Sequence, residues 1–413
     1  LRQVTVVHRG ARDAYEVAAA LADAGLLHRL VTDLYWPADR AWAAGLERIL
    51  PERLVRALQR RFHPRVSSKL VHQTPVSGLT SFLLEKMEAV PFGLRRNAVR
   101  ATDAHLGRTA GRLAAGAGSL LLSYSYYGYH AFRSYGGPGI LFQLHPHPLS
   151  VRRILQQELR DHPEWAESLN KEWELALPAR DFETLVKETR LANSFLVASS
   201  FTRQTLIENG APPESIRVIP YGVDLARFTP GTCMTSAEGP LRLLFVGTVT
   251  QRKGIGYLLE ALRLAGRTNV ELTICGRTAG NRTLFEPFRD RVHIREFVSP
   301  AELQAAYRTA DLFVLPSLAE GFAHVLLEAL ASGLPVLSTT HTAAPDLIEE
   351  GVHGFVVEPR RSDLLAERIE WAFTHRAELA RMRGAARKRA EEFSWQRFRE
   401  AIAGTVGAWI AKG

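Results

Sequence analysis

The sequence predicts an α/β protein made of two doubly wound domains in tandem, which face each other across a cleft. Three observations predict this fold class. The 413 residues exceed what one hydrophobic core usually holds. Short apolar runs alternate with helical stretches, and a small, polar, Gly- and Pro-rich segment at residues 229–240 separates two such series. In sheets of this kind, ligands bind outside the carboxyl ends of the strands.

Each series supplies its own set of strands. The first domain, residues 1–228, is predicted to have strands at 4–8, 30–32, 120–123, 140–143, 195–198 and 217–220, with a first helix at 14–24. The second domain, residues 241–392, is predicted to have strands at 241–246, 270–275, 292–294, 312–315, 335–338 and 355–357. Residues 393–413 form a closing segment. Because helices separate the strands, both sheets should be parallel.

Composition indicates a folded enzyme or binding protein, since 46% of residues are hydrophobic and 23% are charged. The two cysteines, Cys233 and Cys275, fall in the interdomain segment and at a strand end, so we expect no disulfide and a reducing compartment. No apolar run reaches the roughly 18–20 residues that span a bilayer, and the start shows no signal-peptide pattern. We therefore expect a cytoplasmic protein, at most attached to the inner face of the cell membrane.

The net charge of +9 is concentrated in residues 51–100, which hold ten basic and three acidic residues. Such a window could contact nucleic acid, an anionic membrane or an acidic substrate. We expect no nucleic acid, because aromatic residues are not interleaved with the basic ones. The basic 45–70 segment also carries apolar residues at helical spacing. It is either an amphipathic helix on an anionic membrane, near a lipid-linked acceptor, or an ordinary surface helix.

A cationic turn follows the first strand of the second domain. Gly247 and Thr248 open it, and Arg252 and Lys253 stand together near its end, before a helix. Two adjacent cations beside a helix start suit a diphosphate leaving group, whose oxygens gain charge as a glycosidic bond breaks. A basic turn exposed to solvent is the plainer interpretation.

A second segment with chemical potential follows the strand at 312–315. Glu320 precedes a helix predicted to begin near Gly321, and Glu328 lies just over two turns along it. The free N–H groups of a helix start can bind phosphate or sugar hydroxyls, and the two carboxylates can address different parts of one extended ligand. An N-terminal acidic residue plus a surface glutamate would be the structural alternative.

Candidate residues of the first domain also follow predicted strands. His145 and His147 come after the strand at 140–143, where a histidine would face the cleft; we expect a catalytic or donor-contacting role for His145 before His147. The tyrosines at 124, 126, 127 and 129 could line an acceptor site or pack between helices. No group of metal-ligand type and spacing is present, so we expect no metal. The loop at Gly10 lacks the further glycines of a dinucleotide fingerprint.

Taken together, residues 191–393 resemble the retaining glycosyltransferases of family 4, which have the GT-B fold of two Rossmann-like domains. The resemblance is carried by segments in the right order: 199–202, 218–224, the Phe245-Val246-Gly247 to Lys253-Gly254 loop, the two glutamates with seven residues between them, and 354–357. One departure is Thr248, where the family often has arginine; Arg252 is expected to supply that charge.

The resemblance implies a role for each matching residue. Arg252 and Lys253 would contact the diphosphate, which Gly10, Gly247 and Thr248 border. Glu320 and the backbone of residues 321–324 would hold the transferred sugar, with His145 near its C6 hydroxyl. Glu328 would bind the ribose, and the stretch near Val298 would lie against the base. The remaining donor-site residues are Gly321, Phe322, Ala323, His324 and Val325. The closing helix would cross back onto the first domain.

The predicted activity is therefore retaining transfer of a hexose-type sugar from a nucleotide diphosphate to a glycan, lipid-linked or small-molecule acceptor. His145, Lys253 and Glu320 are the expected catalytic residues. Neither metal nor cofactor is expected beyond the donor, because two cations and a helix dipole can neutralise the diphosphate. We predict front-face attack, with the leaving phosphate taking the acceptor proton. A GT-B-like sugar phosphorylase or a nucleotide-sugar epimerase is the alternative.

Overall fold

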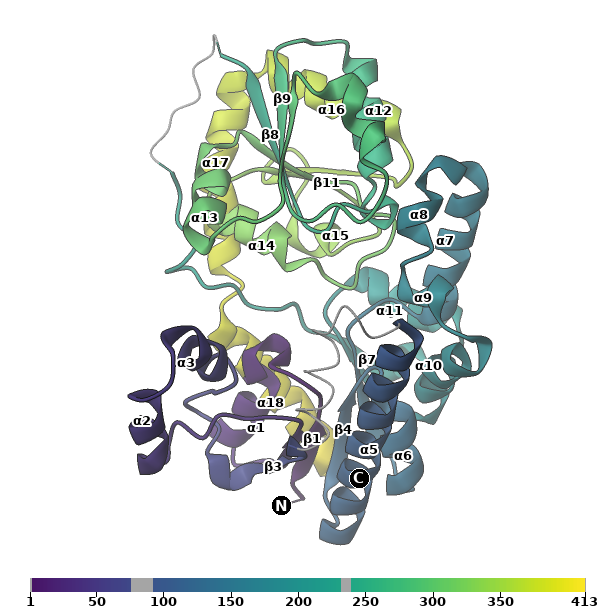
Figure 1. The fold of residues 1–413 in the computed structure, drawn as a ribbon, viewed down its shortest axis with the longest axis vertical. Helices are drawn as coiled ribbons and strands as arrows, with labels where there is room; N and C mark the ends of the chain where they lie inside the picture. Colours follow the sequence, from purple (N-terminus) through teal and green to yellow (C-terminus); the bar gives the residue numbers. More distant parts are fainter. Residues whose placement is uncertain (1, 76–91, 232–238, 413) are drawn as a thin grey trace.

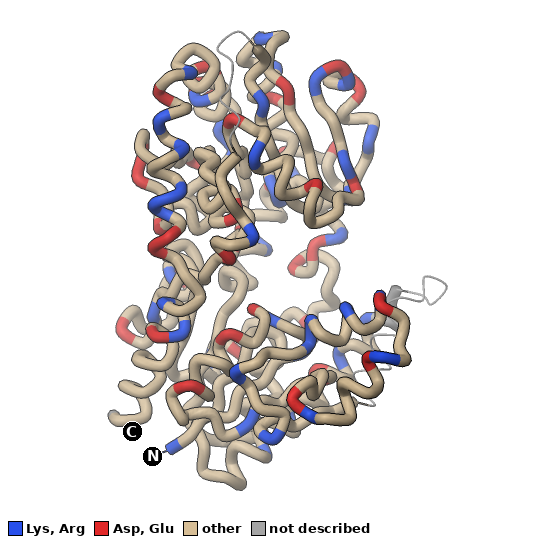
Figure 2. Tube along the Cα trace, turned by 90° about the vertical axis from the view of Figure 1, so that its left-hand side faces the viewer, with Lys and Arg blue, Asp and Glu red and all other residues tan. Residues whose placement is uncertain are grey.

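The computed structural model describes residues 2–75, 92–231 and 239–412, which form two domains stacked along the long axis of the molecule (Figure 1). Each domain is a parallel sheet covered by helices, so the predicted pair of Rossmann-like domains is confirmed. Cys233 and residues 232–238 of the interdomain segment lie outside the described residues, as do residues 76–91 of the basic window. Figure 2 shows basic and acidic positions interspersed over both domains.

The first sheet has seven strands in the order β3-β2-β1-β4-β5-β6-β7. These are β1 (Val4–Val7), β2 (Leu27–Thr32), β3 (Val71–Gln73), β4 (Leu120–Tyr124), β5 (Gly139–Gln143), β6 (Ser194–Val197) and β7 (Ile216–Val218). Both faces of its central strands are buried, which is why they appear in the sequence as continuous apolar runs. The edge strand β3 was not predicted, since it is only three residues long and only partly buried.

Ten helices of the described residues surround this sheet. They are α1 (Glu16–Asp23), α2 (Ala41–Glu47), α3 (Glu52–Gln59), α5 (Phe92–Ala117), α6 (Gly128–Tyr135), α7 (Pro148–Asp161), α8 (Ala166–Leu169), α9 (Trp173–Ala176), α10 (Ala179–Leu191) and α11 (Ser200–Glu208). In Figure 1, α7, α8 and α9 rise from the first domain along one side of the second. The first domain therefore reaches past the gap between the sheets.

The second sheet has six strands in the order β10-β9-β8-β11-β12-β13. They are β8 (Leu241–Val246), β9 (Val270–Cys275), β10 (Val292–Arg295), β11 (Leu312–Leu315), β12 (Val336–Thr339) and β13 (Gly354–Val357). The helices are α12 (Ile255–Ala265), α13 (Pro300–Thr309), α14 (His324–Ala331), α15 (Ala344–Leu347), α16 (Ser362–Thr374), α17 (Arg376–Glu391) and α18 (Trp395–Lys412). The strand order reverses between β8 and β11, and the carboxyl ends of these two strands carry the cationic turn and Glu320.

Two predicted helices differ from those in the structure. The first was expected from residue 14, but α1 starts at Glu16, because Asp13 to Tyr15 have positive φ and Asp13 caps the helix by accepting a hydrogen bond from the Val17 N–H. The apolar residues around 46–62 do not share one helix: Leu46 lies in α2, Leu54 and Leu58 lie in α3, and the others fall between or after these helices. Pro51 is the residue that precedes α3.

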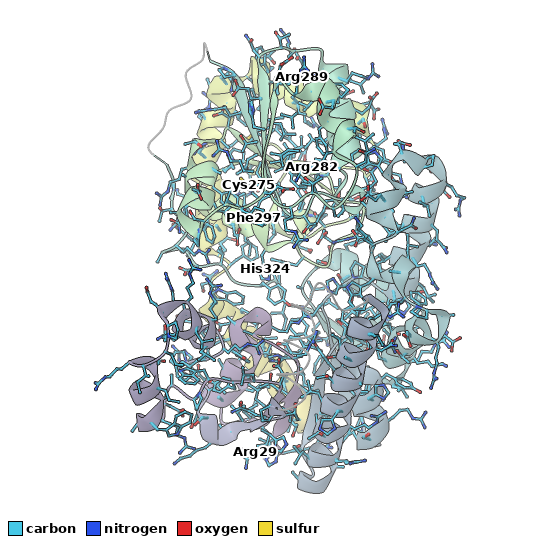
Figure 3. The ribbon with its side chains drawn as sticks, in the orientation of Figure 1. Arg29, Cys275, Arg282, Arg289, Phe297 and His324 are labelled. Carbon is cyan, nitrogen blue, oxygen red and sulfur yellow. The ribbon has the colours of Figure 1, made fainter. Side chains whose placement is uncertain are left out.

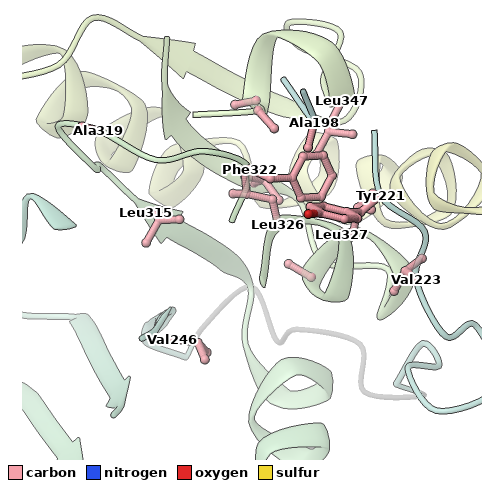
Figure 4. Packing of buried hydrophobic residues seen from close by; sticks show 14 of the residues in the cluster. Ala198, Tyr221, Val223, Val246, Leu315, Ala319, Phe322, Leu326, Leu327 and Leu347 are labelled. Carbon is pink, nitrogen blue, oxygen red and sulfur yellow. The ribbon is translucent and has the colours of Figure 1, made fainter. Parts of the chain in front are cut away.

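The chain passes between the domains twice, and the two passages lie side by side. Val223 pairs with Ser394 in an isolated parallel bridge, and the Val223 N–H donates to the Phe393 carbonyl at 2.9 Å. After the second passage, α18 packs on α1, where Arg399 contacts Glu16 at 2.6 Å. Buried side chains of both domains meet above this point, around Tyr221 and Phe322 (Figure 4).

Candidate active site at the domain interface

The cationic turn is a single 3₁₀ turn, Gln251–Lys253, that ends at Gly254. Gly254 has φ +75°, and a Cβ on it would lie 1.9 Å from the Pro316 carbonyl oxygen. Only glycine fits such a position without moving the backbone. The turn therefore packs directly on the segment after β11. This contact brings the side chains of Arg252 and Lys253 close to Glu320, which belongs to that segment.

Arg252 and Lys253 both pair with Glu320. The Lys253 Nζ lies 2.6 Å from Glu320 Oε1, and Arg252 Nη1 contacts the same oxygen. Arg252 also donates to the Ala319 carbonyl oxygen at 2.9 Å and, through Nε, to Glu172 at 2.8 Å. Residues far apart in the sequence thus form one compact charged cluster, which we call the Lys253–Glu320 cluster: Arg252, Lys253, Glu320 and Glu172.

The cluster fixes the charge of its glutamate. Burial alone would raise the pKa of Glu320, but Arg252 and Lys253 lower it to about 2. Burial lowers the pKa of Lys253, opposed by Glu320, and the pKa of Arg252 is raised by the carboxylates around it despite burial. Glu320 is 8% exposed, so an ionised carboxylate is buried between two cations.

The loop after Glu320 docks on the first domain. A Cβ on Gly321 would lie 1.8 Å from the Leu144 carbonyl oxygen, and the Gly321 carbonyl accepts hydrogen bonds from Ser199 Oγ at 2.5 Å and Thr202 Oγ1 at 3.2 Å. This contact places His145, the next residue after Leu144, beside the cluster. Burial and the nearby Arg252 lower the pKa of His145 to about 4, so its imidazole is neutral near pH 7.

Helix α14 starts at His324, three residues later than predicted from the glycine. The reason is the docking contact, because a carbonyl that accepts bonds from the first domain is held in a non-helical loop, and Ala323 has φ +66°. Glu328 consequently lies little more than one turn into the helix. His324 is exposed, with its ring 4.5 Å from that of Tyr221, and lies where the two domains face each other (Figure 3).

The other predicted donor residues occupy separate places around the cluster. Phe322 is buried against Tyr221, and Val325 and Val298 are partly buried in the second-domain core. Glu328 accepts a hydrogen bond from the Tyr307 hydroxyl at 2.9 Å, and burial raises the pKa of Glu328.

The glycine loops lie at the carboxyl ends of the first strands of the two sheets. The Gly247 N–H donates to the Cys275 carbonyl at 3.0 Å, and the neighbouring Thr248 is exposed. Gly10 has φ +72°, and its N–H donates to Asp33 at 2.8 Å in the first domain. Across the part of the chain that the structure describes, no three or more His, Cys, Asp or Glu side chains gather as a metal site would require.

His147 has a structural position. It is 2% exposed, caps α7 by accepting the Leu149 N–H, and contacts Thr189 Oγ1 at 3.1 Å. The tyrosine cluster occupies two places in the first domain. Tyr124 is buried in the core, whereas the tyrosines at 126, 127 and 129 line a cavity beside the Lys253–Glu320 cluster.

An interdomain clamp holds the cationic turn from the first domain, and it was not predicted. Glu158 of α7 is completely buried and accepts hydrogen bonds from Gln251 at 2.7 Å, Tyr257 at 3.0 Å and Arg360 at 2.9 Å. A Cβ on Gly256 would lie 2.6 Å from Trp165 Nε1. Glutamates in amphipathic helices are usually exposed, so the sequence holds no signal for this contact.

Removing the clamp should destabilise the protein. Glu158→Ala leaves two buried donors and the partly buried Arg360 without their acceptor, which costs about 2–4 kcal/mol, or roughly 4–8 °C at about 2 °C per kcal/mol. Calorimetry measures the melting temperature. The matched control is Glu167→Ala on α8, which removes only an exposed pair with Lys171 and should leave the melting temperature unchanged. Equal melting temperatures for the two variants would show that the clamp is unimportant.

The cavity beside the cluster has a volume of about 480 Å³. Its lining comes mainly from the first domain, through α5, α6, α9, α10 and the loops after β1, β4 and β5, and the second domain contributes Arg252 and Ala319. His145 and Glu172 lie on the wall next to Arg252. The volume falls in the range of small-molecule sites, and the wall is mixed polar and aromatic.

Glu188, in the wall of this cavity, makes the stability of the protein depend on pH. Its carboxylate oxygens accept the Tyr126 N–H at 2.9 and 3.1 Å, and burial raises the pKa of Glu188 from 4.5 to about 8. A raised pKa means that its stabilisation is complete below about pH 4.5 and is lost as the pH rises through 8.

The melting temperature of Glu188→Gln should therefore rise relative to that of the native protein as the pH increases. The glutamine amide stays neutral at every pH and can still accept the Tyr126 N–H, whereas the native carboxyl must ionise in a buried place. The gain between pH 5 and pH 9 should be about 2 °C or more. Glu183→Gln, at an exposed position of the same helix, should show no gain of this kind, and a constant difference for Glu188→Gln would contradict the prediction.

Comparison with known proteins finds a family match within the second half of the chain. Residues 235–389 match the family model of glycosyl transferases group 1. The chain is 35% identical over 174 residues to a putative colanic acid biosynthesis glycosyltransferase, WcaL, of Salmonella typhimurium, covering 39% of this chain and 42% of the relative. It is 30% identical over 235 residues to the amylovoran biosynthesis glycosyltransferase AmsK of Erwinia amylovora, covering 54% and 52%. The chain thus spans about half the length of the curated relatives it matches.

Solved structures resemble the whole chain. Sucrose-phosphate synthase from Thermosynechococcus elongatus aligns with a TM-score of 0.65 at 19% identity, covering 100% of this chain and 99% of that one. HepE of Anabaena in complex with UDP aligns with a TM-score of 0.61 at 18% identity, covering 98% and 100%. At these identities the likeness establishes the shared fold, the two Rossmann-like domains of GT-B proteins.

Proposed function

We propose that this protein is a retaining, metal-independent glycosyltransferase that moves a hexose-type sugar from a nucleotide diphosphate to a glycan, lipid-linked or small-molecule acceptor. The observation that carries the proposal is the meeting of Arg252, Lys253 and Glu320 near His145 of the first domain, beside a cavity that both Arg252 and His145 line. Two cations and a carboxylate at the carboxyl ends of strands suit a diphosphate and a sugar.

The comparisons support this proposal without deciding its details. The group 1 match, residues 235–389, includes the cationic turn and both glutamates. WcaL and AmsK are named for colanic acid and amylovoran biosynthesis, and HepE was solved with UDP. We accordingly propose a role in polysaccharide biosynthesis.

The mechanism follows from the charges in place. The bond from the sugar C1 to the phosphate oxygen breaks while the acceptor oxygen bonds to C1 on the same face, and the leaving phosphate takes the acceptor proton. Arg252 and Lys253 stabilise the charge that grows on the phosphate. Glu320 and the loop to His324 hold the sugar, and His145 acts as a neutral hydrogen-bonding imidazole.

The remaining roles are assigned around this centre. Glu328 binds the ribose, and the stretch around Val298 lies against the base. The glycine loops, with Gly10 in the first domain and Gly247 and Thr248 in the second, border the phosphates.

A thermal-shift panel of nucleoside diphosphates and their sugars tests the function. One nucleotide at 100 times its dissociation constant should stabilise the protein by about 2.7 kcal/mol, and its sugar should be turned over in the presence of EDTA. Nuclear magnetic resonance of the product should show the donor's anomeric configuration. Turnover with inorganic phosphate in place of the nucleotide sugar would instead indicate a phosphorylase, and donor isomerisation without acceptor an epimerase.

We also propose that the basic 45–70 segment contacts an anionic membrane. Ile49 is 81% exposed and Leu54 45%, and no residue of α3 is buried. Arginines at 48, 53, 56 and 60 belong to the same segment as these apolar side chains. An apolar surface with a basic border fits the headgroup region of an anionic bilayer. Within residues 2–75, 92–231 and 239–412, every helix is too short or too polar to cross a bilayer.

Co-sedimentation with vesicles tests this contact. Binding should need anionic lipid, weaken with salt, and fall at least tenfold in the Ile49→Glu/Leu54→Glu variant. Leu264→Glu, which changes an exposed leucine of the second domain, is the control and should bind like the native protein. Binding that is indifferent to lipid charge or to Ile49 and Leu54 would remove the proposal.

A further inference from the structure

We propose that Trp173 and Glu174 of α9 bind the acceptor, and that the group seated on them is a sugar ring. This inference rests on the proposed function, because it names the acceptor class for the same site. Both residues line the cavity beside the Lys253–Glu320 cluster, as do Tyr126 and His145. Transfer requires the acceptor to lie next to the donor sugar, so side chains of this wall are in position to hold it.

Helix α9 is tied to the charged cluster by the residue before it. Glu172 accepts a hydrogen bond from Arg252 Nε at 2.8 Å, and Trp173 is the first residue of the helix. Glu320 and the loop after it, which are proposed to hold the donor sugar, belong to the second domain, whereas α9 belongs to the first. An ionised carboxyl such as that of Glu174 would repel a diphosphate. These two residues therefore suit the acceptor.

Trp173 presents a large aromatic surface that the packing of the protein leaves open. It is 46% exposed, and its ring centroid lies 6.4 Å from that of Tyr126, whose ring lies 5.6 Å from that of His145. The face of an aromatic ring is electron-rich. Because the C–H groups on one face of a pyranose are slightly positive, a sugar ring can stack on an indole in this position.

Glu174 supplies a polar contact that a sugar can use. It is 8% exposed, and across the described residues the hydrogen bond to its carboxyl comes from its own backbone N–H alone. A buried carboxyl with unused acceptor capacity is costly, and sugar hydroxyls are donors that would fill it. Burial and then the charge of Glu174 raise the pKa of Tyr126, so the carboxyl lies near the same aromatic wall.

Tyr126 is fixed in this wall by an unusual backbone. Its φ is +79°, a conformation that residues other than glycine adopt at a cost, and its N–H is held by Glu188 at 2.9 Å. Such strain persists where the surrounding structure enforces it, and it gathers at ligand sites. The strained backbone holds the Tyr126 ring between those of Trp173 and His145.

Ligand-observed nuclear magnetic resonance with simple glycosides tests the binding. The probes are the methyl pyranosides of glucose, galactose and mannose, and the protein is first saturated with the nucleoside diphosphate found by the panel. Saturation transfer to the ring C–H protons of at least one glycoside should be saturable. Its affinity should fall about tenfold or more in Trp173→Leu and stay within about threefold in Trp173→Phe, which keeps an aromatic face.

The choice of leucine separates stacking from a lipid contact, because leucine would still serve an acyl or prenyl chain. Trp42→Leu is the matched control. Trp42 is an exposed tryptophan of α2 outside the cavity, so this variant should bind the glycoside like the native protein.

Transfer assays then test the acceptor itself. The bound glycoside is compared with glycerol, which has hydroxyls but no ring, and with decyl phosphate, a single-chain lipid phosphate. The glycoside should be preferred, and Glu174→Gln should raise its KM about tenfold while affinity for the nucleoside diphosphate is kept. Glu167→Gln, at an exposed position of α8 outside the cavity, should leave the KM unchanged. Calorimetry checks that every variant is folded.

Four outcomes overturn the inference. They are no binding or glycosylation of any of the glycosides, equal affinity in Trp173→Leu and Trp42→Leu, an equal loss in Trp173→Leu and Trp173→Phe, and use of glycerol or decyl phosphate as good as that of the glycoside. If the protein binds no nucleoside diphosphate at all, it is the proposed function that fails, and the glycoside titration without nucleotide still tests Trp173 and Glu174 as a sugar site.

Discussion

Replacing Lys253 by methionine should lower kcat by about 10²- to 10³-fold, the usual cost of one lost electrostatic contact to a transition state, or about 2.7–4 kcal/mol. Methionine keeps most of the aliphatic stem, so the packing around the 14%-exposed side chain is retained. Glu320 also keeps its contact with Arg252. The variant therefore removes the ammonium group from the proposed leaving-group site with little else changed.

Steady-state kinetics with the donor identified by the panel measure this effect, and calorimetry checks that the protein remains folded. Lys388→Met is the control, because Lys388 is an exposed lysine of α17 in the same domain. Its kcat should match that of the native protein. If the Lys253 variant also kept near-native turnover, the cationic turn would have no part in catalysis.

The fold could be predicted because it depends on local patterns. Buried parallel strands such as β4 and β8 are short apolar runs, and the turns between elements contain glycine or proline, so the alternation is visible in the sequence. The errors arose where tertiary contacts override a local preference. Helix α1 starts two residues later than predicted, where Asp13 accepts a hydrogen bond from its first turn. Strand β3 forms only because it can pair with β2.

The candidate site could be predicted in part for the same reason. The cationic turn and Glu320 belong to one domain and follow neighbouring strands, so their approach follows from topology. The contacts across the domain interface do not follow from the topology of either domain. Nothing local marks Glu172 as the partner of Arg252 or Glu158 as the clamp on Gln251, because each depends on how α7 to α9 reach past the gap.

Glu320→Gln should distinguish the contacts to the donor's sugar from the contacts to its diphosphate. Turnover should fall about 10²-fold, because the carboxylate proposed to hold the sugar is gone. The nucleoside diphosphate alone should bind about tenfold more tightly than to the native protein, because no internal carboxylate competes for Arg252 and Lys253. Lys253→Met should show the opposite change and bind the diphosphate more weakly. Isothermal titration of both variants measures the pair of effects.

The pH dependence makes this prediction stricter. Since the pKa of Glu320 is lowered to about 2, the stability its carboxylate contributes is present above about pH 4.5 and is lost only as the pH falls through 2. The difference in melting temperature between Glu320→Gln and the native protein should therefore stay constant from pH 5 to pH 9. Glu349→Gln, an exposed change in the same domain, should alter neither binding nor turnover. A Glu320 variant that binds the diphosphate more weakly would mean that this carboxylate organises the two cations rather than competing with their ligand, and the sugar-holding role would then have to move to another residue of the cavity.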